Sequence, residues 1–342
     1  MLLQVVLFLV GLTLLYFGAE WLVKGASAIA LHFGIRPIVV GLTVVALGTS
    51  MPEFVVNLAA AVGGGEAGGD LALGNIVGSN IANIGLILGL SAIVAPLLVP
   101  TTTLKREYPF FVGVMALFFG LSVDGVLGVL DGLILLVALG GFLTYLIMDT
   151  RARSRDTKAQ EAVNAALADA GLADNVLDEI GLESAPKDQS ASMARRVVLL
   201  TVGSVLLAVG AKMMVDAAVF FADQLQIDPE IVGLTVVAIG TSLPELAASV
   251  IGAAHGEEEM SLGNVLGSNI LNVLFVIGTV ALITPINVIP DQLSIHMPIM
   301  LVFSLILLPM AWLDRRISRL EGSLLLIGFV GYIGYAVWPY MT

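Results

Sequence analysis

The sequence contains no cysteine and few charged side chains. Of its 342 residues, 12% are charged and 58% are hydrophobic, whereas soluble domains are about 25% charged and about 45–50% apolar. The absence of cysteine excludes disulfides, thiol catalysis and cysteine-ligated zinc or iron–sulfur sites. Because so few charges could not cover the surface of a water-soluble fold, we expect most of the chain to lie in lipid.

Basic residues and histidines are also scarce. The net charge of −12 excludes a general nucleic-acid-binding protein. The three histidines, His32, His255 and His296, are scattered at predicted helix ends and form neither a metal-binding set nor a catalytic base beside a nucleophile. We therefore expect no enzyme activity and no cofactor, and the sequence gives no sign of an obligate protein partner. No basic residue precedes the first apolar run, which favours a retained helix over a cleaved signal peptide.

Ten apolar segments are long enough to cross, or nearly cross, a bilayer, which takes about 20 residues. The segments are residues 2–30, 37–62, 70–98, 108–123, 126–148, 196–222, 230–254, 260–284, 294–312 and 319–340. They predict an all-α polytopic membrane protein with ten transmembrane helices. Residues 149–195 are rich in charged side chains and are interpreted as a linker loop. The linker divides the chain into two five-helix halves, residues 1–148 and 196–342.

The distribution of basic residues predicts the orientation in the membrane. Thirteen of the fifteen Lys and Arg residues fall in the linker or in other loops on the same side of the predicted bundle, and basic residues favour the cytoplasmic side. We therefore expect residues 149–195 to be cytoplasmic and both termini to lie outside. The short loops favour the inner membrane of a prokaryotic cell.

The two halves repeat one another. Residues 41–53 read GLTVVALGTSMPE, and residues 233–245 read GLTVVAIGTSLPE. Residues 73–83 read LGNIVGSNIAN, and residues 262–272 read LGNVLGSNILN. Because each half has an odd number of predicted helices, the second half enters the membrane from the opposite side. We predict two inverted five-helix repeats, an architecture of secondary transporters with a substrate site near mid-membrane.

The first motif places a proline and a glutamate inside a membrane helix. Pro52 donates no backbone hydrogen bond and clashes with the carbonyl of Gly48, so the helix should kink or partly unwind there. Carbonyls freed over residues 46–49 need partners, because lipid offers none. Together with the Ser50 hydroxyl and the Glu53 carboxylate, they can ligate a dehydrated cation. The second repeat offers the same set.

The second motif adds hydroxyl and amide oxygens. Ser79 and Asn83 are four residues apart and share a helix face, and Ser268 and Asn272 repeat the relation. Such oxygen ligands suit Ca2+ and Na+ and not Zn2+ or Cu. Taken singly, a proline, hydroxyl or amide in a membrane helix usually serves packing. A central charge costs roughly 2.5–3.5 kcal/mol, so two equivalent glutamates favour an ion site.

The doubled GTS-x-PE and GN-x-x-GSN motifs resemble the alpha-repeats of the cation/Ca2+ antiporter superfamily, and most closely those of the prokaryotic Na+/Ca2+ exchangers. The ten-helix layout with a cytoplasmic loop after the fifth helix is similar as well. The resemblance implies alternating access, in which the first and sixth helices slide across a fixed core. Some relatives, including K+-dependent exchangers, carry Asp where this chain has Asn272. The ion-binding residues that the resemblance implies are Ala46, Thr49, Ser50, Glu53, Ser79, Asn83, Ala238, Thr241, Ser242, Glu245, Ser268 and Asn272.

The predicted function is secondary antiport of Na+ against Ca2+, with both ions as substrates. Two carboxylates, Glu53 and Glu245, give the site two negative charges, which either one Ca2+ or two Na+ would neutralise. Antiport of H+ against Ca2+ or another divalent cation is the alternative, with one of the glutamates carrying the proton. A cation channel is less expected, because channels usually gather several identical subunits around one pore.

Acid–base pairs also recur on the first helix of each half. Aligning the repeats at an offset of 192 places Glu20 opposite Lys212 and Lys24 opposite Asp216. Each pair is spaced i,i+4, which suits an ion pair within one helix. A latch for the sliding helices is the alternative interpretation.

Overall fold

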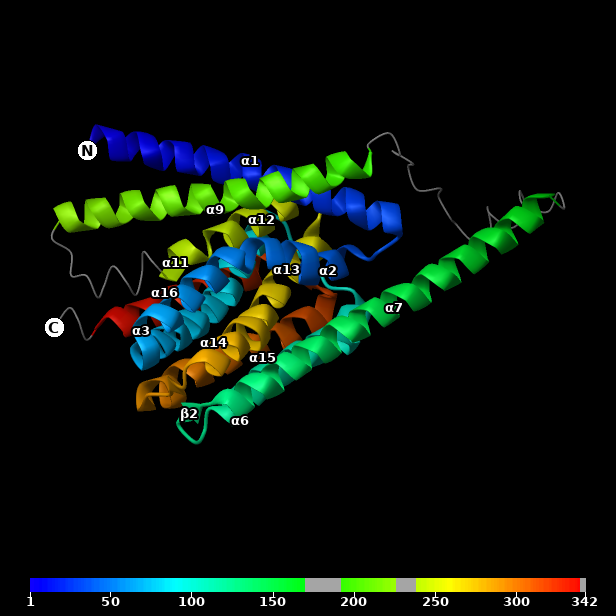
Figure 1. The fold of residues 1–342 in the computed structure, drawn as a ribbon. Coiled ribbons are helices and arrows are strands. Elements are labelled where there is room, and N and C mark those ends of the chain that lie inside the picture. The colour runs from blue at the N-terminus through cyan, green and yellow to red at the C-terminus, as the bar shows by residue number, and fades with distance from the viewer. Residues whose placement is uncertain (170–191, 226–237, 339–342) are drawn as a thin grey trace.

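The chain forms a bundle of long helices, as seen in a computed structural model (Figure 1). The structure describes residues 1–169, 192–225 and 238–338. Within these ranges, eight helical segments are long and apolar enough to cross a membrane. Two shorter elements, α6 (Glu107–Leu121) and the pair α11 (Ala238–Thr241) and α12 (Leu243–Ala254), take the fourth and seventh places. The predicted all-α polytopic membrane fold is confirmed.

The first repeat contains the N-terminal elements. Its long helix α3 (Ala46–Ala82) bends at Gly65, whose φ of 57° separates the second membrane span, Pro37–Gly65, from the third, Ala67–Val94. The other elements of this repeat are α1 (Leu2–Phe33), α2 (Pro37–Val40), the π-helical turn η1 (Gly41–Val45), the π-helical turn η2 (Asn83–Leu88), α4 (Gly89–Val94), β1 (Leu97–Leu98), α5 (Thr101–Lys105), α6, β2 (Val126–Leu127) and α7 (Val129–Asp169).

The second repeat follows the same plan. Besides α11 and α12, it contains α9 (Met193–Gln224), α13 (Glu258–Leu271), the π-helical turn η4 (Asn272–Ile277), α14 (Gly278–Ile283), β3 (Ile286–Asn287), the π-helical turn η5 (Gln292–His296), α15 (Met297–Asp314), β4 (Arg316–Ile317) and α16 (Arg319–Val337). Helix α16 begins with a capping box, in which the Ser318 hydroxyl and the Glu321 carboxylate each bond the other residue's backbone N–H.

Equivalent elements of the two repeats meet across a pseudo-two-fold axis. The π-helical turns η2 and η4 begin at the last asparagine of the second motif in each repeat. The four short strands pair between repeats, β1 with β4 and β2 with β3, both antiparallel. Because β1 corresponds to β3 and β2 to β4, the same contact is made twice, once on each side of the bundle. The inverted repeat predicted from the sequence is thus present in the fold.

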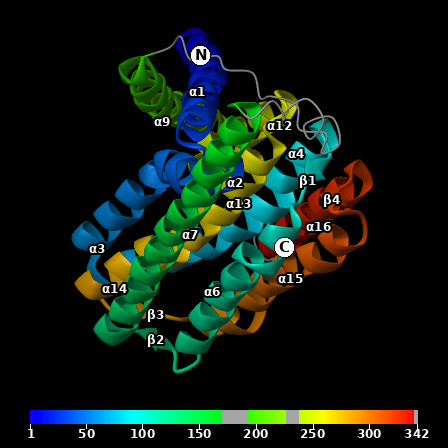
Figure 2. The same ribbon diagram turned by 90° about the vertical axis from the view of Figure 1, so that its right-hand side faces the viewer.

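Helices α1 and α9 lie side by side along one side of the bundle in both ribbon views (Figures 1 and 2). They touch through glycines spaced seven residues apart. A Cβ atom on Gly18 would lie 2.8 Å from the backbone nitrogen of Leu207, and one on Gly203 would lie 2.5 Å from that of Leu22. A larger side chain at these glycines would separate the helices, so the two backbones pack directly against each other.

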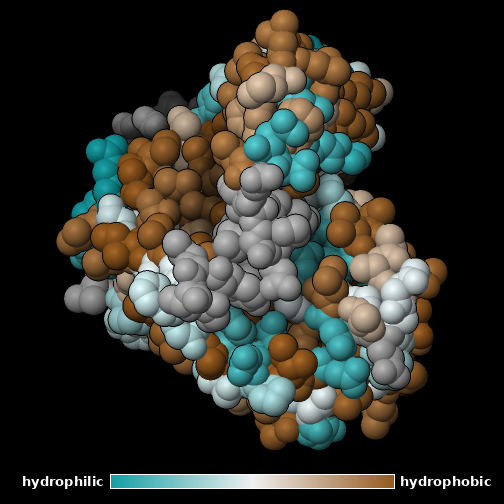
Figure 3. Space-filling view, turned by 90° about the vertical axis from the view of Figure 1, so that its left-hand side faces the viewer, coloured by the Kyte–Doolittle hydropathy of each residue, from teal (hydrophilic) through white to brown (hydrophobic). Residues whose placement is uncertain are grey.

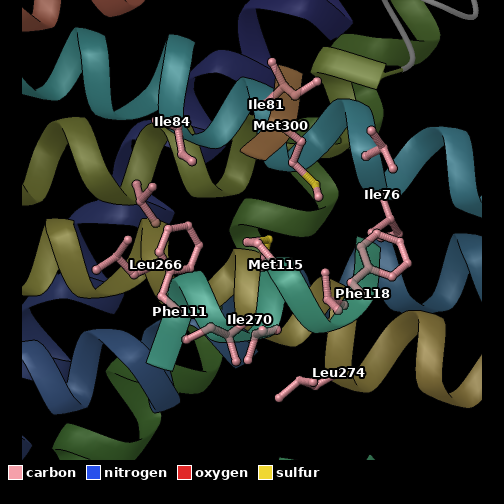
Figure 4. Close-up of a cluster of buried hydrophobic side chains, with 14 of the residues drawn as sticks. Ile76, Ile81, Ile84, Phe111, Met115, Phe118, Leu266, Ile270, Leu274 and Met300 are labelled. Carbon is pink, nitrogen blue, oxygen red and sulfur yellow. The ribbon is translucent and has the colours of Figure 1, made fainter. Parts of the chain in front are cut away.

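The remaining helices share a hydrophobic core. Figure 4 shows part of it, where α6, α13 and η4 meet α3, η2 and α15. Helix α13 is enclosed on every side, and all its residues from Met260 to Leu271 are buried. Seen from the end where α1 begins, the surface carries hydrophilic patches between hydrophobic residues (Figure 3). Because its serine and asparagine side chains are buried as well, α13 lies at the centre of the bundle.

Several helix ends differ from those expected. The third span ends at Val94 and the eighth at Ile283, each shortly before a proline, because a residue preceding proline disfavours the helical conformation. Residues 97–98 and 126–127 were expected to be helical and instead form β1 and β2. Helix α7 continues past residue 148 to Asp169, so the first part of the expected linker loop is helical. The rest of the loop, residues 170–191, lies outside the described residues.

The predicted helix break at proline is found in only one repeat. Helix α3 stays helical through Pro52, and the irregular backbone lies earlier, in η1. In the second repeat the chain leaves the helix at Ser242, between α11 and α12, and Pro244 stands at the start of α12. Of the predicted kink or partial unwinding, unwinding of residues 48–52 is not found in the first repeat, whereas the equivalent stretch of the second repeat is interrupted.

The acid–base pairs of α1 and α9 are local. Lys24 bonds Glu20 of the same helix, and Lys212 bonds Asp216 at 3.0 Å. The lysine side chains are more than half exposed, and exposed pairs of this kind contribute about 0–1 kcal/mol. The geometry supports ion pairing within each helix.

Candidate ion-binding site

The sequence-predicted residues come from four membrane spans, the second, third, seventh and eighth, which meet in the middle of the bundle. Ala46, which begins α3, is buried, as are all the predicted polar residues of α3, α12, α13 and the two π-helical turns. Ala238 begins α11, and Thr241 ends it and is half-buried. The fully or almost fully buried polar members are Thr49, Ser50, Glu53, Ser79, Asn83, Ser242, Glu245, Ser268 and Asn272.

Each glutamate is bonded by a serine of the other repeat. The Ser50 hydroxyl donates to Glu245 Oε1 at 2.7 Å, and the Ser242 hydroxyl donates to Glu53 Oε1 at 2.8 Å. Ser79, on the same repeat as Glu53, also donates to its Oε1. The first motifs of the two repeats therefore meet at the pseudo-two-fold axis, and the serine of each motif bonds the glutamate of the other.

The serines of the second motif, Ser79 and Ser268, each lie against a first-motif serine of the other repeat. Ser268 Oγ lies 2.9 Å from Ser50 Oγ, and Ser79 Oγ lies 2.6 Å from Ser242 Oγ. Close approach of the helices makes these contacts possible. A Cβ atom on Gly267, the residue before Ser268, would lie 2.6 Å from the Leu42 carbonyl oxygen of η1. The glycine of the second motif thus lets α13 reach η1 and the start of α3.

Four buried oxygens at the site have no hydrogen-bond donor. They are Glu53 Oε2, Glu245 Oε2, Asn83 Oδ1 and Asn272 Oδ1, two equivalent pairs. A buried polar atom without a partner costs about 1–3 kcal/mol, and more if it is charged. Because native structures seldom leave such groups unsatisfied, a cation coordinated by these oxygens accounts for all four.

The carboxylates also lack compensating positive charge. Among the described residues, neither Glu53 nor Glu245 forms an ion pair with Lys or Arg; the ion pairs lie near the ends of helices or on exposed faces. The crossed hydrogen bonds of Ser50 and Ser242 place both carboxylates in one buried site. Burying two like charges without counterions is strongly unfavourable, so the electrostatics also favour a bound cation.

Six further polar residues, not among the predicted ligands, surround the site. Asn264 Oδ1 accepts from the Thr49 hydroxyl at 3.1 Å, and its Nδ2 donates to Ser249 Oγ at 2.9 Å. In the first repeat, Asn75 Nδ2 donates to Asn57 Oδ1 at 3.1 Å. The signal for Asn75 and Asn264 was present in the sequence, because both stand at the same place in the repeated LGN segment. The other two, Asn80 and Asn269, contact each other at the polar centre of the bundle.

Comparisons with known proteins agree with this arrangement. The family described as sodium/calcium exchanger protein matches residues 3–148 and 196–338. The putative antiporter CaxA of Alkalimonas amylolytica is 37% identical over 97% of this chain and 98% of its own length. The inner membrane protein YrbG of Escherichia coli K12 is 35% identical over 99% of this chain and 98% of its own length. A solved structure of the sodium-calcium exchanger NCX_Mj superposes with a TM-score of 0.77 at 30% identity, covering 98% of both chains.

Proposed function

This chain belongs to the sodium/calcium exchanger protein family, and on that premise we propose that it exchanges Na+ for Ca2+ across a membrane by alternating access. The observation that carries the proposal is the set of four buried oxygens without donors on Glu53, Glu245, Asn83 and Asn272. Carboxylate and amide oxygens are the ligands that Ca2+ prefers, and Na+ accepts the same kind of ligand. The chain is a membrane transporter and not an enzyme.

The charge of the site supports exchange between these two ions. With Glu53 and Glu245 ionised, one Ca2+ neutralises the pocket, and two Na+ do the same. Ca2+ and Na+ therefore compete for the same oxygens, which is the condition for antiport. Exchange of more than two Na+ for each Ca2+ would move net charge and respond to membrane voltage.

We assign ligand roles to all twelve predicted positions. The glutamates provide charge, while the serines hold one carboxylate oxygen of each glutamate and add hydroxyl ligands. Ala46 and Ala238 contribute through their carbonyls, and Thr49 and Thr241 through hydroxyl or carbonyl oxygens. Asn83 and Asn272 contribute Oδ1. The paired helices α1 and α9, joined by glycine contacts, form a unit suited to slide past this core.

We also propose an orientation in the membrane. Helix α1 begins and α16 ends at one end of the bundle, whereas α7 projects from the other end (Figure 1). Basic residues in the last part of α7 and the first turn of α9, among them Arg151, Arg153, Arg195 and Arg196, favour a cytoplasmic location for that second end. We therefore place residues 149–195 in the cytoplasm, between a first repeat (1–148) and a second repeat (196–342). The similarity to the inner membrane protein YrbG of Escherichia coli supports an inner-membrane location.

The coupling ion is tested with 45Ca2+ uptake into proteoliposomes that contain the purified protein. The vesicles are loaded with Na+, with K+ or with an acidic buffer and diluted into 45Ca2+ medium without Na+. We expect uptake only from Na+-loaded vesicles, and its loss when an ionophore dissipates the Na+ gradient. Uptake driven by the pH gradient alone would assign the chain to H+/Ca2+ antiport, and equal uptake under every condition would indicate a channel.

The serines that cross between repeats offer a graded test. Ser50→Ala and Ser242→Ala each remove a hydrogen bond to a buried carboxylate, an interaction worth about 1.5–3 kcal/mol. We expect each variant to weaken Ca2+ binding about tenfold, measured as the Ca2+ concentration for half-maximal uptake. Ser304→Ala is the matched control, because Ser304 is equally buried but its hydroxyl bonds the Met300 carbonyl of its own helix and no site residue. Equal effects in site and control variants would contradict the assigned roles.

A further inference from the structure

Two asparagines outside the predicted ligand set meet at the pseudo-two-fold axis. Asn80 follows Ser79 in the first repeat, and Asn269 follows Ser268 in the second; both are fully buried. Asn80 Nδ2 lies 3.4 Å from the backbone carbonyl oxygen of Asn269, and Asn269 Nδ2 lies 3.2 Å from that of Asn80. The two amides therefore bond each other's main chain in a reciprocal pair.

Backbone carbonyls determine which way these amides face. A carbonyl oxygen only accepts hydrogen bonds, so the amide NH2 of Asn80 and that of Asn269 must point toward it. The Oδ1 atom of each residue is then turned to the opposite side. There Asn80 Oδ1 accepts from Asn272 Nδ2 at 3.1 Å, and Asn269 Oδ1 accepts from Asn83 Nδ2 at 2.8 Å.

The orientation of Asn80 and Asn269 also determines the orientation of Asn272 and Asn83 at the ion site. Because Asn272 and Asn83 donate an N–H to these oxygens, the Oδ1 atom of each points away from Asn80 or Asn269. Those two atoms are among the four buried oxygens that have no donor. The chain of bonds thus runs from a backbone carbonyl, through Asn80 or Asn269, to an amide that presents oxygen and not nitrogen.

We propose that Asn80 and Asn269 are positioning residues, an amide clamp that holds Asn272 and Asn83 with Oδ1 available to the cation. This inference rests on the proposed function, because it concerns ligands of the same site. The two ends of an Asn amide have nearly the same shape and opposite polarity. A flipped Asn83 or Asn272 would turn N–H donors toward a cation, so fixing the flip favours cation binding.

The surroundings of the clamp disfavour the alternative orientation. The other neighbours of Asn80 Nδ2 are sulfur atoms, Met115 Sδ at 3.8 Å and Met300 Sδ at 3.9 Å. Figure 4 shows both methionines within the hydrophobic cluster. Neither sulfur nor a carbonyl oxygen can donate a hydrogen bond, so a reversed amide would turn Asn80 Oδ1 toward the Asn269 carbonyl oxygen and the two sulfur atoms, without a donor. The apolar core therefore helps to fix the polarity of the clamp.

A double-mutant cycle tests the clamp. Equilibrium 45Ca2+ binding is measured in Na+-free buffer on purified wild type, Asn80→Leu, Asn272→Ala and the double variant. We expect Asn80→Leu to weaken binding about tenfold in the wild-type chain, because the Asn272 amide is no longer held. In the Asn272→Ala chain, where there is no amide to orient, the same change should alter binding less than about twofold. An equal factor in both backgrounds would overturn the clamp, because it would mean a structural role only.

A conservative variant separates orientation from packing. Asn80→Asp keeps an oxygen that accepts from Asn272 Nδ2 but loses the donor to the Asn269 carbonyl. We expect it to bind 45Ca2+ at least as well as the wild type, and weakening as large as that of Asn80→Leu would overturn the clamp. Thermal unfolding is recorded for every variant, and Asn80→Ala replaces Asn80→Leu in the cycle if the latter is unfolded. A wild-type protein that binds no 45Ca2+ would overturn the proposed function, and the clamp with it.

Discussion

Glu53→Gln and Glu245→Gln should each abolish Na+-dependent Ca2+ uptake. Both carboxylates are fully buried, and no basic side chain pairs with either among the described residues. Removing one leaves a divalent cation facing a single negative charge in a site shielded from water. Breaking a buried charge interaction by removing one partner costs about 3–5 kcal/mol, so we expect Ca2+ binding to weaken about 100-fold or more.

The measurement is 45Ca2+ uptake from Na+-loaded proteoliposomes, with protein incorporation checked for each variant. Glu20→Gln is the matched control, because Glu20 is also a membrane-helix glutamate but pairs with the exposed Lys24. The control should transport at the wild-type rate. Uptake that persists in either site variant at ordinary Ca2+ concentrations would mean that its glutamate is not an ion ligand.

Gly267→Ala should disrupt both the fold and the site. A Cβ atom on Gly267 would lie 2.6 Å from the Leu42 carbonyl oxygen and 2.8 Å from Ala46 Cβ, closer than packed atoms allow. Overpacking of this kind destabilises by about 1–3 kcal/mol. Relief requires α13 to move away from α3, which would also separate Ser268 from Ser50. We therefore expect a lower unfolding temperature and Ca2+ binding weakened about tenfold.

The same substitution elsewhere provides the control. Gly140 lies on an exposed face of α7, and nothing stands within 4 Å of the position that a Cβ would occupy. Gly140→Ala should leave binding unchanged and raise helix stability by up to about 1 kcal/mol. If Gly267→Ala unfolded at the wild-type temperature and bound Ca2+ normally, the close packing of α13 against η1 and α3 would be disproved.

Much of the architecture could be predicted because the two halves of the sequence carry the same two motifs. The repeated motifs fixed the equivalence of Glu53 and Glu245, and the odd number of helices in each half required the second copy to be inverted. That reasoning also led to the buried serines, since they stand at the same positions of both copies. The hydrogen bonds from Ser50 to Glu245 and from Ser242 to Glu53 follow from symmetry once two inverted copies meet.

Other features depend on contacts that periodicity does not encode. A π-helical turn at Asn83 and Asn272 has no propensity signature, and Pro52 remains inside a helix although its equivalent in the second repeat follows a break. The reach of α7 to Asp169 was missed because a charged helix in water has the composition of a linker. The orientation of the Asn80 amide depends on which carbonyl lies opposite, which only the packed structure reveals.

The most direct test of a site shared by Ca2+ and Na+ is equilibrium 45Ca2+ binding to the purified protein at increasing Na+ concentrations, with choline keeping the ionic strength constant. The account predicts that the apparent Kd for Ca2+ rises with Na+ more steeply than in proportion, because two or more Na+ replace each Ca2+ on the same oxygens. K+ in place of Na+ should leave the Kd unchanged. Ca2+ binding that does not change as Na+ is added would contradict competition for one site, and with it Na+/Ca2+ exchange.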